Sequence, residues 1–301
     1  MSVTSRKFTP THRESHHCVI TGPLKGTVPA AITPLKDGGS ALDESAIAPY
    51  LDFLIAHGAT GVLAMGTTGE GILLRIAERR AVIERYVEAA NGRIPVAVHA
   101  GAQTTADSVA LAVHAAEVGA AAVAVIGPPY FPLDAEGQYR HLRAVAAACH
   151  PTPFYVYELA QAAGYAFDPA MLLRLRDDQD NVVGMKVSDA PWEKFERYLL
   201  DGYDVLVGPE ALIHRGMQAG AVGAVSALAS AFPDRVAAVV NEPTEAGAAG
   251  LRDLRAAIER TQRHAALKRI LARRGVPVAP DVRAPLRDLD AAELALLDSI
   301  E

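Results

Sequence analysis

The segment at positions 181–189 reads Asn181-Val182-Val183-Gly184-Met185-Lys186-Val187-Ser188-Asp189. Its apolar, β-branched composition predicts a strand that is buried on both faces, with one lysine near its end. The other five lysines of the chain lie in polar or turn-like segments, or on helices that can expose them to water. Burying an ammonium group costs several kcal/mol unless the group is paired or loses its proton. Lys186 is therefore either a salt-bridged or solvent-reaching lysine at a strand end, or a nucleophilic amine able to form a Schiff base.

Apolar runs of this kind recur along the chain and alternate with amphipathic helical segments. The runs occupy 27–32, 61–65, 94–99, 121–126, 153–157, 182–187, 205–207 and 221–226. The helical segments occupy 42–57, 72–91, 105–118, 133–149, 169–176, 192–200 and 211–219. Eight such units predict an α/β fold, a (β/α)8 TIM barrel with a parallel sheet. A doubly wound open sheet is the alternative, and we favour the barrel because Thr33-Pro34, rather than a glycine-rich dinucleotide loop, follows the first strand.

The pattern divides the chain into three parts. We expect a flexible N-terminal tail at 1–22, the barrel at 23–232 and a C-terminal helical region at 233–301, with helices at 233–240, 245–272 and 291–299. The tail contains His12, His16, His17 and Cys18, but their spacing is not that of a structural zinc site, and we predict no metal site.

Composition excludes several classes of protein. The formal charge is −6 with both signs interspersed, which predicts no nucleic-acid partner. The longest charge-free stretch, 216–232, is mostly Gly, Ala and Ser, and residues 1–17 lack the apolar core of a signal peptide, so we expect no membrane association. Two cysteines, Cys18 and Cys149, form no disulfide framework and favour a cytoplasmic location.

The ends of the predicted strands carry polar groups that suit a carbonyl substrate. The second strand ends in Gly66-Thr67-Thr68-Gly69-Glu70, which offers hydroxyls and backbone N–H groups to a carboxylate or phosphate, or simply caps the following helix. Tyr130 follows two prolines after the fourth strand, and Tyr155 and Tyr157 share one face of the fifth. Each tyrosine is either a proton shuttle or a packed aromatic side chain. The small residues at 219–227 allow a ligand to approach the backbone or pack tightly in the barrel.

Together these residues resemble the dihydrodipicolinate synthase / N-acetylneuraminate lyase family of pyruvate-dependent class I aldolases. The resemblance covers nearly the whole chain from Gly26. It is carried by Ala31-Ile32-Thr33-Pro34, Gly66-Thr67-Thr68-Gly69-Glu70, Pro128–Tyr130 with Glu136-Gly137, Tyr157, Gly184-Met185-Lys186 and Val282-Arg283-Ala284-Pro285-Leu286.

The resemblance implies a role for each of these site residues and needs no cofactor. Lys186 would form the Schiff base with pyruvate or another 2-oxo acid, and Tyr157 would be the general acid and base. Thr68 and nearby N–H groups would bind the carboxylate. Thr67 and Tyr130 would complete a proton relay, with Tyr130 supplied across a dimer interface. Val225 and Gly208 would line the pocket, and the assembly would be a homotetramer formed from two dimers.

The segment after Tyr157 departs from the family pattern. Synthases of the family carry an arginine five positions after this tyrosine to hold the second substrate's carboxylate, and Ala162 stands there in this chain. Losing that interaction costs a few kcal/mol. We therefore expect a small, apolar acceptor half of the site, with Glu158 binding hydroxyl groups if it points inward.

The leading hypothesis is a class I aldolase, a lyase that makes or breaks a C–C bond between pyruvate and an aldehyde. The alternatives are a 4-hydroxy-tetrahydrodipicolinate synthase, which condenses pyruvate with aspartate semialdehyde using another cation for its carboxylate, and a dehydratase or decarboxylase that uses the same imine. A non-catalytic barrel that binds 2-oxo acids is the alternative from outside the enzymes.

Overall fold

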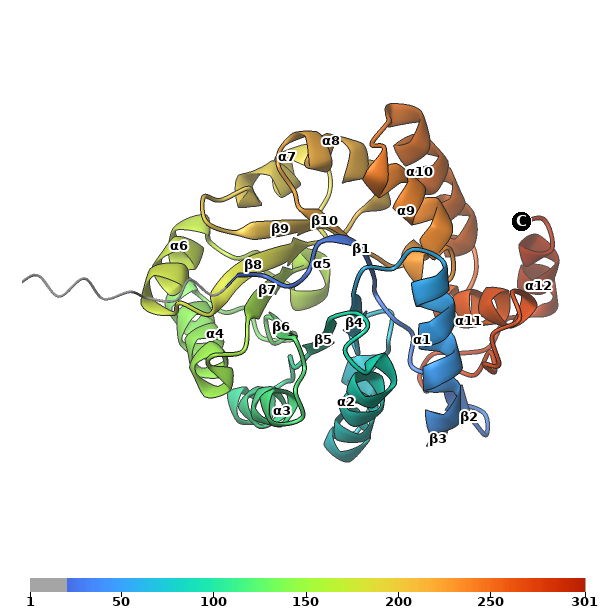
Figure 1. Ribbon diagram of the computed structural model, residues 1–301, viewed down its shortest axis with the longest axis horizontal. Helices are drawn as coiled ribbons and strands as arrows, with labels where there is room; N and C mark the ends of the chain where they lie inside the picture. Colours follow the sequence, from blue (N-terminus) through green and yellow to red (C-terminus); the bar gives the residue numbers. More distant parts are fainter. Residues whose placement is uncertain (1–20, 301) are drawn as a thin grey trace, which may run out of the picture.

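The computed structural model describes residues 21–300, and eight parallel strands form a barrel within them (Figure 1). The strands are β1 (Gly26–Pro29), β4 (Val62–Ala64), β5 (Val96–His99), β6 (Ala122–Ile126), β7 (Phe154–Glu158), β8 (Val182–Val187), β9 (Asp204–Val207) and β10 (Gly223–Ser226). They pair in the order β1-β10-β9-β8-β7-β6-β5-β4. Ala30 makes a parallel bridge to Leu63, and the Ala31 N–H donates to the Leu63 carbonyl at 2.9 Å. The two edges of the sheet therefore meet, and the predicted TIM barrel is confirmed.

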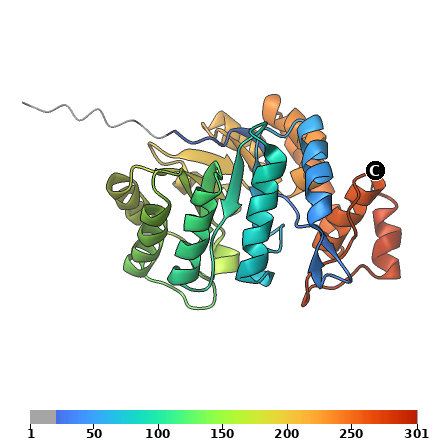
Figure 2. The ribbon, with the colours of Figure 1, turned by 60° about the horizontal axis from the view of Figure 1, so that its bottom comes forward.

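A helix follows each barrel strand and covers its outer face. These helices are α1 (Ile47–Ala56), α2 (Ile76–Ala90), α3 (Thr105–Glu117), α4 (Ala135–Cys149), α6 (Pro169–Asp178), α7 (Trp192–Phe195), α8 (Ile213–Gln218) and α9 (Pro233–Asn241), and the short α5 (Ala160–Ala163) precedes α6. Helices α1 to α4, coloured blue to green, stand side by side in Figure 2. Side-chain caps begin three of the helices, because Thr104, Asp134 and Asp168 each accept an N–H of the first turn.

Several predicted boundaries were wrong. The predicted helix at 42–57 begins only at Ile47, because β2 (Leu35–Lys36) and β3 (Ala41–Leu42) form an antiparallel hairpin and Glu44–Ala46 a 3-10 turn. The predicted helix at 245–272 is two helices, α10 (Glu245–Glu259) and α11 (Arg263–Arg273). Four more 3-10 turns adjoin the barrel helices, at Gly71–Leu73, Glu196–Tyr198, Glu210–Leu212 and Leu228–Ser230.

The C-terminal helices lie against one side of the barrel. Helix α9 packs on β1 and β10 and is the eighth barrel helix, although the sequence division at 232 places it in the C-terminal region. Helix α10 packs on α9 and α11 on α10, and α12 (Ala291–Leu297), drawn in red, lies farthest from the barrel in Figure 1. None of the helices in residues 21–300 has the length and apolar character to cross a membrane. The predicted flexible tail lies almost entirely outside the described residues, as do His12, His16, His17 and Cys18.

The barrel interior is filled mostly by small and medium side chains and by one large one, Tyr155. Alternation along the strands sends Val28, Ala97, Ala124, Tyr155 and Leu206 inward, all of them buried. The other strand faces pack against the helices in a larger cluster. The interior is therefore a packed core rather than a pore, and it supports the residues at the C-terminal ends of the strands.

Candidate active site

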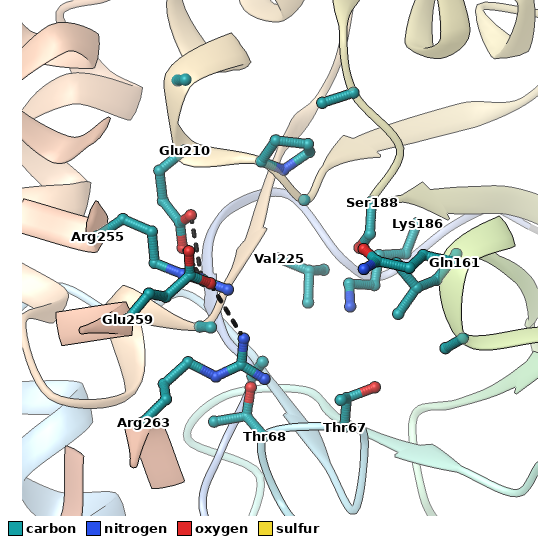
Figure 3. A pocket seen from close by; sticks show the side chains of 18 of the residues that line it. Thr67, Thr68, Gln161, Lys186, Ser188, Glu210, Val225, Arg255, Glu259 and Arg263 are labelled. Carbon is teal, nitrogen blue, oxygen red and sulfur yellow. Dashed lines mark hydrogen bonds and ion pairs between the residues drawn. The ribbon is translucent and has the colours of Figure 1, made fainter. Parts of the chain in front are cut away.

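A cavity of about 540 Å³ opens at the C-terminal ends of the strands (Figure 3). Its size falls within the range of small-molecule sites. Six of the eight predicted site residues line it, namely Thr67, Thr68, Tyr157, Lys186, Gly208 and Val225. Tyr130 and Glu158 do not. The fold therefore brings together residues from five strand ends that are up to 158 residues apart in the sequence, from Thr67 to Val225.

Lys186 lies beside Tyr157 on neighbouring strands. The two residues are register partners of β8 and β7, and the Lys186 Nζ stands 3.6 Å from the centre of the Tyr157 ring. Lys186 is 6% exposed. The amine thus stands in the cavity against an aromatic face, and no carboxylate of residues 21–300 pairs with it, so the salt-bridged interpretation of this lysine is wrong. Its role as a reactive amine stays a prediction.

Neighbouring groups lower the pKa of the Tyr157 hydroxyl. It makes a 3.0 Å hydrogen bond with the Thr67 hydroxyl, in which either oxygen can donate. Burial alone would raise the pKa of the phenol, but the charge of Lys186 and hydrogen bonds with Lys186, Thr67 and Ser188 together lower it below its ordinary value. A phenol with a lowered pKa gives up its proton more easily, which suits a group that takes and returns a proton. Ser188, two residues after Lys186 on the same strand face, was missed by the sequence reasoning, although the period-two pattern could have found it.

Thr67 and Thr68 are held in place by an unusual backbone. Met65 (φ 59°) and Glu70 (φ 56°) are both left-handed, so the chain turns sharply on either side of the two threonines. A side chain at Gly69 would meet the Ala31 carbonyl at 2.8 Å, so glycine lets this loop pack directly on the first strand. Thr68 is 3% exposed and lines the cavity. Neither threonine caps the 3-10 turn that follows, so the capping interpretation of this motif is wrong.

Glu70 anchors this loop to the C-terminal region. One carboxylate oxygen accepts from the Lys268 Nζ at 2.6 Å, and the other accepts from the Arg283 N–H at 2.6 Å. Both members of the ion pair have fully buried side chains. The expectation that Lys268 is exposed to water is therefore wrong. Burial lowers the pKa of the Lys268 amine, and the Glu70 carboxylate opposes that change. His264, which lies on α11 with Lys268, makes a hydrogen bond through its Nε2 with the Thr67 carbonyl at 3.0 Å.

The remaining wall of the inner cavity consists of backbone and a small apolar group. Gly208 follows β9, and a side chain there would clash with the Ser188 hydroxyl and the Val187 carbonyl. Val225 of β10 is buried and borders the cavity. These residues shape a space beside Lys186 and carry no reactive group.

Tyr130 lies outside the cavity. It is 83% exposed, has a left-handed backbone (φ 87°) and stacks edge-on with Phe131. Within one chain it does not reach Tyr157, so its part in a relay stays a prediction that a second copy of the chain would have to complete.

Glu158 does not bind substrate in this arrangement. It is 1% exposed and lies on the strand face opposite Tyr157, where its carboxylate accepts the Phe167 N–H at 2.8 Å. The expectation that it binds hydroxyl groups is therefore wrong. Burial, with a contribution from the nearby Asp189 charge, raises its pKa to about 7.

We expect the Glu158→Gln variant to change how stability depends on pH. Because the folded pKa of about 7 lies above the ordinary value of 4.5, this group's contribution is fully present below about pH 4.5 and is lost as the pH rises through 7. From pH 5 to pH 8 the wild type should lose up to about 3 kcal/mol of unfolding free energy that the variant keeps. Urea unfolding at both pH values measures this difference. Parallel pH profiles for the two proteins would contradict it.

The outer half of the cavity is charged, contrary to the expected small apolar acceptor half. Arg252, Arg255 and Glu259 reach it from α10, Arg263 from α11 and Glu210 from the loop after β9. Sequence reasoning did not assign the three arginines or Glu259 to the site, because nothing local distinguishes them from the solvent-exposed charges of an ordinary helix. Glu210 lies just after a predicted strand end, so the strand-end rule could have found it. Among residues 21–300 no group of three or more His, Cys, Asp or Glu side chains could hold a metal ion.

Comparison with known proteins identifies the family of the chain. The model of the dihydrodipicolinate synthetase family matches residues 23–300. The chain belongs to this family. It is 34% identical over 285 residues to an uncharacterized DapA-like lyase of Halobacterium salinarum, covering 92% of both chains. It is also 34% identical over 234 residues to a 4-hydroxy-tetrahydrodipicolinate synthase of Thermus thermophilus, covering 77% of this chain and 78% of the relative.

Solved structures of the family superpose on the barrel. The N-acetylneuraminate lyase of Proteus mirabilis matches with a TM-score of 0.82 and 30% identity, covering 93% of this chain and 99% of that one. The synthase and the lyase act on different substrates, as their names state. Family membership therefore establishes the fold and the relation to lyases, and it leaves the substrate to the residues of the cavity.

Proposed function

We propose that the protein is a pyruvate-dependent lyase that works through a Schiff base on Lys186. The observation that carries the proposal is the position of Lys186 in the cavity, where its Nζ stands 3.6 Å from the centre of the Tyr157 ring. The Tyr157 hydroxyl is in turn hydrogen-bonded to the Thr67 hydroxyl. An amine and a phenol this close can act on one carbonyl group in sequence. The cofactor-free chemistry and the cytoplasmic location remain predictions from the sequence.

The proposed reaction begins with attack of the Lys186 amine on C2 of a 2-oxo acid. Water leaves, and a protonated imine forms. In the cleavage direction the Tyr157 phenolate takes the proton of the C4 hydroxyl, the C3–C4 bond breaks and its electron pair enters the imine to give an enamine. The C4 fragment leaves as an aldehyde. The enamine then takes a proton at C3, and water releases pyruvate from the lysine.

Thr68 and the backbone N–H groups of its loop are proposed to hold the carboxylate of the 2-oxo acid. Both threonines line the cavity, and hydroxyl and backbone N–H donors of this kind stabilise an anion. Thr67 would pass protons to and from Tyr157. Tyr130 of a second copy would extend this relay, which requires a dimer, and the homotetramer remains what the family resemblance implies. The exposed apolar side chains Ile72, Tyr130 and Phe131 support self-association on this side of the barrel.

The experiment that tests the proposal is reductive trapping. The protein is incubated with pyruvate and borohydride, its intact mass is measured by mass spectrometry, and the modified peptide is sequenced. We expect one reduced pyruvate adduct per chain, on the peptide that contains Lys186. No gain in mass, or an adduct on a different lysine, would overturn the proposal.

We expect Tyr157→Phe to separate imine formation from bond cleavage. The ring that packs on Lys186 remains, so pyruvate should still be trapped, while turnover should fall by about 10²- to 10⁴-fold because the proton shuttle is lost. Tyr203→Phe is the matched control, since its hydroxyl donates to the Leu172 carbonyl away from the cavity. Single-turnover rates and trapped mass are the two measurements. Equal loss of trapping and turnover would argue against this role.

A second candidate is a 4-hydroxy-tetrahydrodipicolinate synthase, the activity in the name of the Thermus thermophilus relative. Ala162 in place of the family's arginine argues against it, and the arginines of the outer cavity argue for it. Condensation of pyruvate with aspartate semialdehyde, measured against other aldehydes, decides between the two.

A further inference from the structure

We propose that Arg255 and Arg263 form an anion subsite for the far end of the second substrate. The inference rests on the proposed function, because it assigns the half of the cavity that pyruvate does not fill. The substrate class would be a 4-hydroxy-2-oxo acid with a second acidic group, a carboxylate or a phosphate. In the direction of synthesis it would be an aldehyde that carries such a group.

The two arginines face the reactive lysine across the cavity. Arg255 reaches the wall from α10 and Arg263 from α11, and both line the same space as Lys186 and Thr68. Figure 3 shows their guanidinium groups on the opposite side of the hollow from Lys186. A chain whose C2 is bound to Lys186 would therefore extend toward them.

The carboxylates of this wall are already occupied by protein donors. Glu210, 3% exposed, accepts from the Ser226 hydroxyl at 2.7 Å and from the Leu228 N–H at 3.0 Å, and it also pairs with Arg255 at 3.3 Å. Glu259 accepts from both arginines, from Arg255 at 2.7 Å and from Arg263 at 3.3 Å. These acids hold the arginines in place and have little capacity left to accept from substrate hydroxyl groups.

Not every N–H donor of these arginines is used by the protein. Among the described residues the Arg263 guanidinium has one protein acceptor, Glu259, which it meets through Nη1 at 3.3 Å, so its Nη2 has no acceptor from the protein. Arg252 adds a third guanidinium to the rim and pairs there with Asp253 at 2.9 Å, so the residues that line the outer wall include three cations and two anions. A guanidinium N–H donor that faces the cavity without a protein acceptor can be satisfied by an anionic oxygen, and the planar group matches the geometry of both carboxylate and phosphate.

This arrangement offers a replacement for the missing arginine at position 162. Ala162 lines the same cavity and has no charge to contribute. The cation for the second substrate would come instead from helices that follow the barrel, which changes the side from which that substrate is held.

The test compares aldehyde acceptors that differ only in a terminal anion. Succinate semialdehyde is paired with butanal, and glyceraldehyde 3-phosphate with glyceraldehyde, each with pyruvate. In the wild type we expect at least a tenfold higher kcat/KM for the anionic member of at least one pair, and the better pair identifies carboxylate or phosphate. In Arg263→Gln this preference should fall at least tenfold, with neutral aldehydes changed less than twofold. Arg263→Lys should retain part of the preference, and Arg260→Gln, on the same helical hairpin but outside the cavity, should retain all of it.

Equal use of anionic and neutral aldehydes by the wild type would overturn the subsite, as would an equal loss for both in Arg263→Gln. Trapping of pyruvate alone keeps the two proposals separate, since Arg263→Gln should form the adduct as the wild type does. If the wild type traps no pyruvate, the proposed function fails, and calorimetric titration with succinate and with inorganic phosphate then tests the subsite directly. Binding that Arg263→Gln weakens and Arg260→Gln does not would support it, and absent or unchanged binding would contradict it.

Discussion

Replacing Lys186 by alanine is expected to abolish the trapped pyruvate adduct and to lower turnover by about 10⁴- to 10⁶-fold, the scale seen when a covalent nucleophile is removed. The physical reason is that the electron pair of the breaking C–C bond then has no imine to enter. No other lysine can substitute, because among residues 21–300 Lys186 is the lysine that lines the cavity. Intact mass after borohydride treatment and single-turnover rates measure the two effects.

Lys194→Ala is the matched control, since Lys194 is an exposed lysine on the neighbouring α7. It should leave both adduct and rate unchanged. The same adduct in Lys186→Ala as in the wild type would show that the imine, if one forms, lies elsewhere, and the assigned mechanism would then be wrong.

Replacing Lys268 by methionine is expected to destabilise the protein by about 3–5 kcal/mol, because it leaves the Glu70 carboxylate buried without its partner. The side chains of both residues are fully buried, and Lys268 also donates to the Asp281 carbonyl at 2.6 Å. Urea unfolding at neutral pH measures the loss. Since Glu70 fixes the loop that carries Thr67 and Thr68, pyruvate trapping by the folded fraction should also become slower.

The double variant Glu70→Gln, Lys268→Met distinguishes a lost ion pair from lost packing. With both charges removed, most of the stability lost in Lys268→Met should return, because neither an ammonium nor a carboxylate is left unpaired. Lys36→Met, on the exposed hairpin, controls for the substitution itself. A double variant as unstable as Lys268→Met would show that the pair is not the source of the effect.

The location of Glu158 follows from a rule that the sequence already contained. Alternation along β7 places it opposite Tyr157, and the buried carboxylate accepts a backbone N–H there. Its carboxyl group attracted a functional interpretation because a charged residue at a barrel strand end is commonly part of a site. The alternation of side chains along the strand places Glu158 correctly, and its position at a strand end does not.

The arginines of the outer cavity could not be found from a local pattern in the same way. Arg255 and Arg263 lie on amphipathic helices whose polar faces resemble any solvent-exposed surface. Only the packing of α10 and α11 over the strand ends turns part of those faces into a cavity lining. The predicted apolar acceptor half was wrong for this reason, and Ala162 alone was not enough to describe it.

The amino-acid sequence by itself determined the eight-strand barrel, the bounds of β8 and the gathering of Lys186, Tyr157, Thr67 and Thr68 at one end. Strand and helix periodicity are local properties, and a closed parallel barrel places all of its strand ends together. The tertiary structure alone decided that Lys268 is buried against Glu70, 198 residues away, and that arginines from the C-terminal helices face the cavity. These are contacts between distant segments, and their energy depends on which side chains the folded chain excludes from water rather than on any local pattern.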